Sequence, residues 1–137
     1  MAYDLNRFLK AQEDSYSQAL REIKNGRKCS HWIWYIFPQV KGLGFSSTSQ
    51  YYGLDGLGEA QAYIANSTLR SRLLEISEAL LTLESSDPTA VMGYPDDLKL
   101  RSSMTLFAEA APEYPVFQQV LDKFYGGKKD SGTLALL

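Results

Sequence analysis

The sequence predicts an all-α, mainly helical fold: a compact single-domain bundle of six to eight helices around an aromatic central segment. Three observations lead to this prediction. Apolar residues such as Leu69, Leu73, Ile76 and Leu80 recur at three- and four-residue steps, the spacing of one helix face. Residues that cap or end helices separate these periodic stretches. The alternating apolar and polar pattern of half-buried strands is scarce.

The composition is typical of one ordinary globular domain, residues 1–137. Hydrophobic residues make up 45% of the 137 residues and charged residues 22%, which is usual for such proteins. The net charge of −2 argues against general nucleic-acid binding, which usually needs a basic protein. We expect a cytoplasmic protein without a membrane span, since apolar runs are short, a signal pattern is missing and Cys29 is the single cysteine.

The first half of the chain predicts four helical segments and one long loop. A helix is expected over 4–9, and the pattern restarts near 13–15 to continue as a second helix that Asn25-Gly26 ends. A short helix is expected over 32–37, with Ser30 as its cap. The stretch 42–50 is expected to be irregular, and 57–64 to be a short helix.

The second half predicts three helices and two short turns. Asn66 or Ser67 caps the most regular helix, which is expected to cross the centre of the domain. Asp87 precedes Pro88 as the cap of a short turn. Asp96 or Asp97 is expected to cap the next helix. The expected helices lie at 67–83, 97–111 and 116–124, with turns at 88–92 and 133–137.

The aromatic central segment is Ser30–Gln39, which holds both tryptophans and the only histidine. Aromatic side chains dominate the energetics of cores and pockets, so the fold and any site are expected to form around it. His31 is the one side chain that ordinarily titrates near neutral pH. It is either a general acid or base beside a ligand, or a core histidine hydrogen-bonded by backbone.

Cations lie near the aromatic segment and recur beside hydroxyl groups in a later helix. Such groups, together with the free N–H groups of a helix start, make up anion and phosphate sites. The alternative for each charge is a solvated surface position. The residues concerned are Arg27, Lys28, Lys41, Lys99, Arg101, Ser102 and Ser103.

Other chemistry finds less support in the sequence. One histidine and one cysteine leave carboxylates as the remaining ligands of a structural zinc, which is uncommon, so we expect neither a metal nor a cofactor. Cys29 is expected to pack as a small hydrophobic residue. Glu59 is explained as a favourable charge in the first turn of its helix.

Two motifs resemble an uncharacterised bacterial family, the DUF1810 domains, whose members are often mislabelled calpastatin. The motifs are Ser30–Gln39 with the following Gly42–Gly44, and Lys99–Phe107. The resemblance extends from Asp4 to Leu137. It implies a mainly helical fold and no established activity.

The C-terminal half is also similar to a family of ADP-ribose-related N-glycosidases typified by the riboflavin-pathway glycosidase. Lys99, Met104, Phe107, Leu121 and Gly126-Gly127 match its spacing. The segment 60–72 fits that family loosely as well. The family has a Thr-Glu-His-type motif before this half, whereas the nearest positions here are Thr48, Gln50 and Tyr51. The missing acid argues against hydrolase chemistry, whereas a nucleotide-sugar pocket is compatible with its absence.

Two functional hypotheses follow. In the first, a pocket binds, with or without processing it, a small phosphorylated ligand of nucleotide or ADP-ribose type; an enzyme of this kind would be an N-glycosidase-like hydrolase. His31 would orient the ligand or transfer a proton, and the binding residues would be Trp34, Lys41, Tyr51, Tyr52, Lys99, Arg101 and Ser103. In the second, the protein is a non-enzymatic helical adaptor for a protein partner. A pocket needs His31, a tryptophan and Lys99 to line one cleft, whereas an adaptor would bury both tryptophans.

Overall fold

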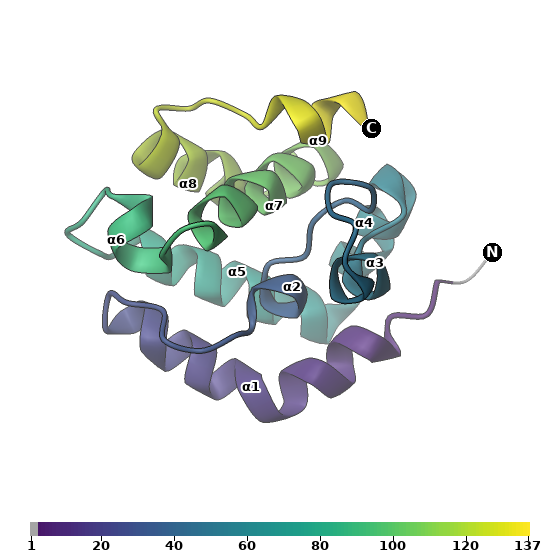
Figure 1. Ribbon diagram of the computed structural model, residues 1–137, viewed down its shortest axis with the longest axis horizontal. Helices are drawn as coiled ribbons and strands as arrows, with labels where there is room; N and C mark the ends of the chain where they lie inside the picture. The colour runs from purple at the N-terminus through teal and green to yellow at the C-terminus, as the bar shows by residue number, and fades with distance from the viewer. Residues whose placement is uncertain (1–2) are drawn as a thin grey trace.

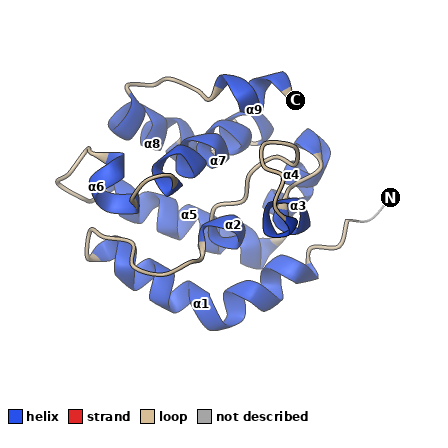
Figure 2. Cartoon of the chain, viewed as in Figure 1, coloured by secondary structure: helices blue, strands red, loops and turns tan. Residues whose placement is uncertain are grey.

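A computed structural model describes residues 3–137, which form nine helices without strands (Figures 1 and 2). The bounds are α1 Asn6–Lys24, α2 Ile33–Ile36, α3 Ser47–Tyr52, α4 Gly56–Ala65, α5 Ser67–Leu81, α6 Pro88–Met92, α7 Asp96–Ala110, α8 Val116–Tyr125 and α9 Ser131–Ala135. The predicted all-α class is confirmed. The number of helices in residues 3–137 is larger than the expected six to eight because α3 begins inside the stretch 42–50, expected to be irregular.

Helix α1 is a single element, so the predicted restart near residue 13 is wrong. The polar residue at the apparent break, Gln12, is buried on the inner face of the helix. Its amide nitrogen lies 2.7 Å from the Tyr35 carbonyl oxygen and 2.9 Å from the Tyr63 hydroxyl. A buried side chain amide is tolerated when it is hydrogen-bonded. Gln12 therefore interrupts the apolar pattern without interrupting the helix.

Helix α7 lies at the centre of the fold. The sequence predicts that the helix over 67–83, here α5, crosses the centre. It contacts α2, α4, α6, α8 and α9, and ten of its fifteen residues are buried. Figure 1 shows it crossing the middle of the molecule, with α5 between it and α1. A helix surrounded in this way is apolar or small on most sides, which is why its amphipathic pattern is weaker than that of α5.

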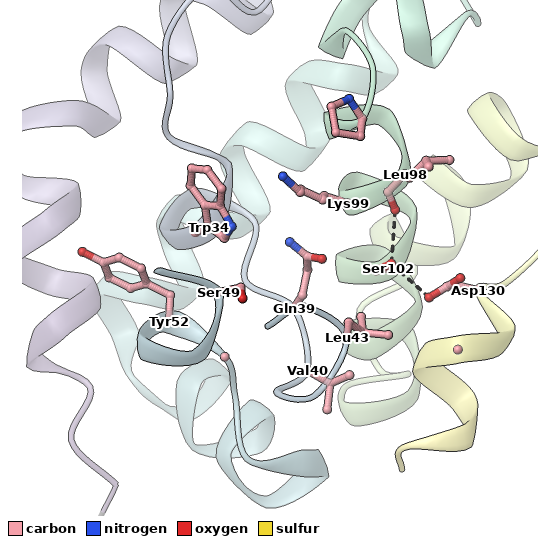
Figure 3. Close-up of a pocket in the computed structure, with 14 residues that line it drawn as sticks. Trp34, Gln39, Val40, Leu43, Ser49, Tyr52, Leu98, Lys99, Ser102 and Asp130 are labelled. Carbon is pink, nitrogen blue, oxygen red and sulfur yellow. Dashed lines mark hydrogen bonds between the residues drawn. The ribbon is translucent and has the colours of Figure 1, made fainter. Parts of the chain in front are cut away.

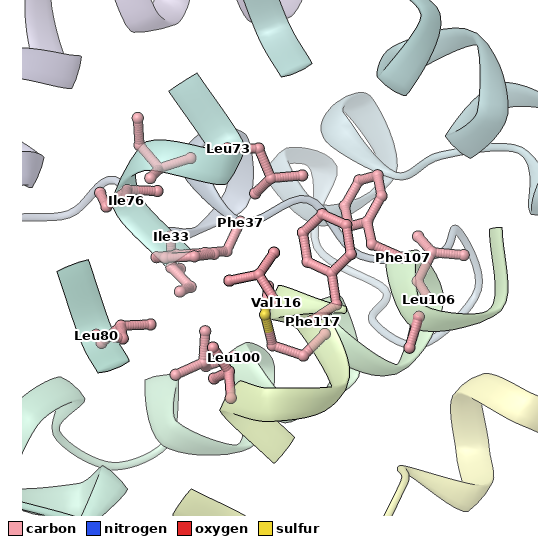
Figure 4. Packing of buried hydrophobic residues seen from close by; sticks show 14 of the residues in the cluster. Ile33, Phe37, Leu73, Ile76, Leu80, Leu100, Leu106, Phe107, Val116 and Phe117 are labelled. Atoms are coloured by element: carbon pink, nitrogen blue, oxygen red, sulfur yellow. The ribbon is translucent and has the colours of Figure 1, made fainter. Parts of the chain in front are cut away.

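The aromatic segment enters the core, as predicted. Ile33 and Phe37 lie near leucines and the single isoleucine of α5, and near side chains of α7 and α8 (Figure 4). A line of ring contacts also joins four helices. Phe8 to Tyr63, Tyr63 to Phe107, and Phe107 to Phe117 have centroid separations of 5.2, 5.4 and 5.6 Å, within the favourable range for aromatic pairs.

Several predicted helix ends are confirmed. Asn66 Oδ1 accepts hydrogen bonds from the backbone of Thr68 and Leu69, both at 3.1 Å. Asp87 caps α6 in the same way, and Gly126 adopts the left-handed conformation after α8, as glycine does at low cost.

The predicted cap of α7 is wrong. Pro95 occupies the cap position without a side-chain hydrogen bond. Asp97 is buried and accepts a 2.7 Å hydrogen bond from the Thr89 hydroxyl, which ties α6 to α7. Asp96 forms a 2.6 Å ion pair with Lys28. Both carboxylates bind groups that precede α7 in sequence, an arrangement that depends on tertiary structure.

Candidate functional site

A cavity of about 330 Å³ lies between the aromatic segment, α3, the start of α7 and the loop entering α9 (Figure 3). Its volume is near the lower end of the range of about 300–1,000 Å³ usual for small-molecule sites. The lining residues are Trp34, Gln39, Val40, Leu43, Gly44, Ser49, Tyr52, Gly53, Pro95, Leu98, Lys99, Ser102, Asp130 and Gly132.

One wall is set by a close approach of two backbone segments. Lys41 N lies 2.8 Å from Leu54 O, and Leu54 N lies 2.9 Å from Gln39 O, which forms a short parallel bridge. A Cβ atom at Gly53 would lie 2.8 Å from the Lys41 Cα. The two segments can therefore meet only because residue 53 has no side chain.

The cation of the cavity is Lys99, in the first turn of α7. Its Nζ lies 4.6 Å from the Trp34 ring centroid, within the range of a cation–π interaction. It also lies 3.5 Å from Asp96 Oδ1. Asp96 is shared, because its other oxygen pairs with Lys28. Two lysines against one carboxylate leave a net positive charge at this end of the cavity.

Two neutral polar groups accompany this cation. Figure 3 shows the Gln39 amide reaching into the cavity and the Trp34 indole nitrogen on the side that faces it. Among residues 3–137, neither group makes a hydrogen bond. Both are therefore available to a ligand, the indole as a donor and the amide as donor and acceptor.

The opposite end of the cavity holds the carboxylate of Asp130, which caps α9. Its Oδ2 accepts hydrogen bonds from Ser102 Oγ at 2.9 Å, Thr133 N at 3.1 Å and Thr133 Oγ1 at 2.6 Å. Burial alone would raise the pKa of Asp130, but these hydrogen bonds and the Arg101 charge outweigh it and lower the pKa below its ordinary value. The group is thus ionised at neutral pH.

Helix α7 also positions the loop that carries Asp130. The Arg101 guanidinium donates to the carbonyl oxygens of Lys128 and Lys129 at 3.0 and 2.9 Å. Thr105 Oγ1 accepts a 2.9 Å hydrogen bond from the Asp130 backbone N–H. These bonds satisfy backbone groups of an otherwise irregular segment and fix the carboxylate at the cavity edge.

With this geometry established, comparison with known proteins places the chain in a family. The model of the family described as "Protein of unknown function (DUF1810)" matches residues 2–137. The chain belongs to the DUF1810 family. The crystal structure of the conserved hypothetical protein Rv1873 from Mycobacterium tuberculosis is similar, with 44% identity and a TM-score of 0.96 over 98% of this chain and 96% of that one. No curated protein matches the chain. The DUF1810 resemblance is confirmed.

Three of the eight predicted site residues of this DUF1810 protein meet in the cavity: Trp34, Tyr52 and Lys99. Trp32 is 1% exposed and belongs to the core. A cavity lined by one tryptophan and Lys99 matches part of the pocket hypothesis, which also required His31.

The other five predicted residues do not line the cavity. His31, Lys41 and Tyr51 are exposed outside it, and His31 faces solvent because its neighbour Trp32 turns inward. The Arg101 guanidinium donates its hydrogen bonds to backbone carbonyl oxygens. Ser103 is fully buried, and its hydroxyl has no partner within residues 3–137. Besides Trp34, Tyr52 and Lys99, the polar residues that line the cavity are Gln39, Ser49, Ser102 and Asp130, of which the sequence had singled out Ser102.

Sequence reasoning missed the residue that holds the aromatic segment in place, Glu22. Its Oε1 accepts from Cys29 N at 2.7 Å, Ser30 N at 3.0 Å and Trp32 Nε1 at 3.0 Å, and its Oε2 accepts from Ser30 Oγ at 2.7 Å. Burial alone would raise the pKa of Glu22, but these hydrogen bonds lower it to about 2. The available signal was an acidic residue on the apolar face that includes Ala19 and Ile23.

Two further findings bear on chemistry. Cys29 is exposed, so the expectation that it packs as a small hydrophobic residue is wrong; its backbone N–H, not its side chain, is held by Glu22. Across the described chain, no three His, Cys, Asp or Glu side chains gather closely enough to hold a metal ion, and no helix there has the length and apolar character required to cross a membrane.

Proposed function

We propose that this DUF1810 domain binds a small phosphorylated molecule of nucleotide or ADP-ribose type in the cavity beside Trp34. The observation that supports this most is the convergence of a lysine ammonium, an indole N–H and a side-chain amide on one cavity of ligand size. Hydrogen-bond donors that converge with a positively charged group favour phosphate binding.

Lys99 is the phosphate-binding residue in this proposal. Its side chain is 27% exposed, so a ligand reaches it, while partial burial strengthens the attraction between opposite charges relative to water. Trp34 and Asp96 already restrict the lysine side chain. Binding therefore costs less side-chain entropy than it would with a free surface lysine.

The remaining lining suits the organic part of such a ligand. Val40, Leu43 and Leu98 provide apolar surface, and Tyr52 provides a ring. Trp34 contributes its indole N–H, because the Lys99 ammonium lies over its ring and competes with a stacked base. The cavity matches a mononucleotide or sugar phosphate in scale, and a larger ADP-ribose derivative would extend beyond it.

A thermal-shift and calorimetry screen tests this proposal, with ADP-ribose, NAD, nucleotides, sugar phosphates and inorganic phosphate as probes. A ligand at 100 times its Kd adds about 2.7 kcal/mol to the free energy of unfolding, which raises Tm by several degrees in a domain of this size. Lys99→Met keeps the aliphatic stem and removes the charge, and we expect it to weaken binding at least tenfold.

Lys10→Met is the matched control, because Lys10 is an exposed lysine of α1 outside the cavity. It should bind as the natural protein does. The proposal fails if no probe binds at millimolar concentration, or if K99M and K10M bind equally well. Binding of a protein partner without any small-molecule binding would favour the adaptor hypothesis instead.

A further inference from the structure

The cavity has two charged ends, and their spacing follows from α7. Lys99 and Ser102 are three residues apart in this helix, so they lie on one face with a rise of about 4.5 Å between them. Ser102 hydrogen-bonds Asp130 directly, at 2.9 Å (Figure 3). The carboxylate therefore lies about one helical turn from the lysine end, in the lining of the same cavity.

One carboxylate oxygen of Asp130 is available to accept hydrogen bonds from a ligand. All three of its side-chain hydrogen bonds reach Oδ2, and within residues 3–137 Oδ1 accepts none. The bonds to Ser102 and Thr133 hold the carboxylate in one orientation, and the bonds from Arg101 to the preceding carbonyls hold its backbone. A fixed carboxylate oxygen in a cavity is a strong acceptor for a ligand hydroxyl or amine.

The charge around Asp130 favours a hydroxyl. The hydroxyls of Thr133 and Ser102, and to a smaller extent the Arg101 charge, already stabilise the ionised carboxylate, so its negative charge is partly offset before a ligand ammonium could bind. A neutral hydroxyl needs no such charge and still forms a charge-assisted hydrogen bond. A second phosphate at this end would be repelled.

We propose that the cavity binds a pentose phosphate unit, free or within a nucleotide, in a single orientation, with its phosphate at Lys99 and its vicinal hydroxyls donating to Asp130 Oδ1. This inference rests on the proposed function above and adds that the protein recognises the sugar hydroxyls of the ligand as well as its phosphate. In the reverse orientation the phosphate would face the carboxylate, so the two ends together fix the direction of binding.

The natural protein provides the first test, by calorimetry with ribose 5-phosphate, 2-deoxyribose 5-phosphate and inorganic phosphate. Removing the 2-hydroxyl takes away one of the two donors to a partly buried carboxylate oxygen, and sites that hydrogen-bond a hydroxyl discriminate against the analogue that lacks the group. We expect the ribose compound to bind at least tenfold more tightly than the deoxy compound. Equal affinities for the two sugars would overturn this inference.

Asp130→Ser provides the second test, because serine also caps helices but does not reach as far as aspartate. We expect D130S to bind both sugars equally and to keep its affinity for inorganic phosphate. Asp87→Ser is the matched control, since Asp87 caps α6 outside the cavity, and it should keep the tenfold preference. If D130S does not fold, the comparison of sugars with the natural protein decides alone.

The two proposals fail in different ways. Binding of phosphate and of both sugars with equal affinity, lost in K99M, would leave the phosphate site standing and overturn the role of Asp130. The absence of any binding, or binding that K99M leaves unchanged, would overturn both.

Discussion

The strongest prediction about the stability of this protein concerns Glu22. Its carboxylate accepts four hydrogen bonds from residues 29–32, one of them from the indole of the buried Trp32. Hydrogen bonds to a charged group contribute about 1.5–3 kcal/mol each in mutational studies, and neutral ones about 0.5–1.5 kcal/mol. Because the four bonds act as one network, their contributions do not add in full.

Two substitutions separate charge from hydrogen bonding. Glu22→Gln keeps one acceptor oxygen but removes the charge, and we expect it to lower the free energy of unfolding by about 2 kcal/mol. Glu22→Ala also leaves the Trp32 indole and two backbone N–H groups without this acceptor, and should cost about 3–5 kcal/mol. The measurement is urea unfolding at pH 7, followed by tryptophan fluorescence and circular dichroism.

The pH dependence tests the same reasoning independently. The pKa of Glu22 is lowered from 4.5 to about 2 in the folded protein, so the ionised group stabilises the fold fully above pH 4.5. This contribution is lost as the pH falls from 4.5 through 2. E22Q cannot titrate at this position. The difference in unfolding free energy between the natural protein and E22Q should therefore be largest at pH 7 and shrink toward pH 3.

Glu13→Gln is the control on the same helix, because Glu13 is exposed and forms no ion pair or side-chain hydrogen bond within residues 3–137. It should change the free energy of unfolding by less than about 0.5 kcal/mol. A cost below that value for E22Q, or a difference from the natural protein that stays constant with pH, would refute the role assigned to Glu22.

Two further predictions concern the cavity wall and the core. Gly53→Ala places a Cβ atom 2.8 Å from the Lys41 Cα, so we expect it to lower the free energy of unfolding by about 1–3 kcal/mol and to weaken ligand binding. Gly26→Ala is the control, because its position has a positive φ but open space around it, so the substitution causes backbone strain without a steric clash. Equal ligand affinity in both variants would contradict the prediction. Phe117→Ala removes a fully buried ring 5.6 Å from Phe107 and should cost about 3–5 kcal/mol in chemical unfolding, with a cost under 1 kcal/mol as the contrary result.

The parts of the fold that were predictable are those determined by neighbouring residues. Asn66 and Asp87 cap helices through backbone groups two or three positions away, and Gly126 ends α8 through its own conformation. Interactions between residues so close in the chain can be predicted from the local sequence, because they do not depend on the rest of the fold.

The errors arose where a polar residue has a distant partner. Gln12 resembles a helix break until Tyr35 and Tyr63 supply its hydrogen bonds. Asp96 and Asp97 resemble helix caps until Lys28 and Thr89 are brought near them. The residue types are the same in both interpretations, so only the tertiary structure distinguishes a local role from a distant one.

The candidate site divides along the same line. Trp34 and Lys99 were predictable because each belongs to a distinctive motif, and the fold brings the two motifs together. Asp130 follows two glycines and two lysines in a segment without periodicity, and nothing there predicts that it reaches the cavity. Arg101 was singled out for its charge, but the carbonyl groups of the α8–α9 loop take up its guanidinium.

The core and the cavity are joined through one chain of polar contacts. Glu22 fixes residues 29–32, and Lys28, directly before them, pairs with Asp96 at the start of α7. Asp96 in turn contacts Lys99, whose ammonium lies over Trp34 of the same aromatic segment. A ligand anion at Lys99 would compete with Asp96 for the lysine while Lys28 keeps Asp96 in place. The second lysine would therefore allow Lys99 to be released to a ligand without leaving the partly buried Asp96 carboxylate unpaired, which would give the Lys28–Asp96 pair a role in the proposed site as well as in the fold.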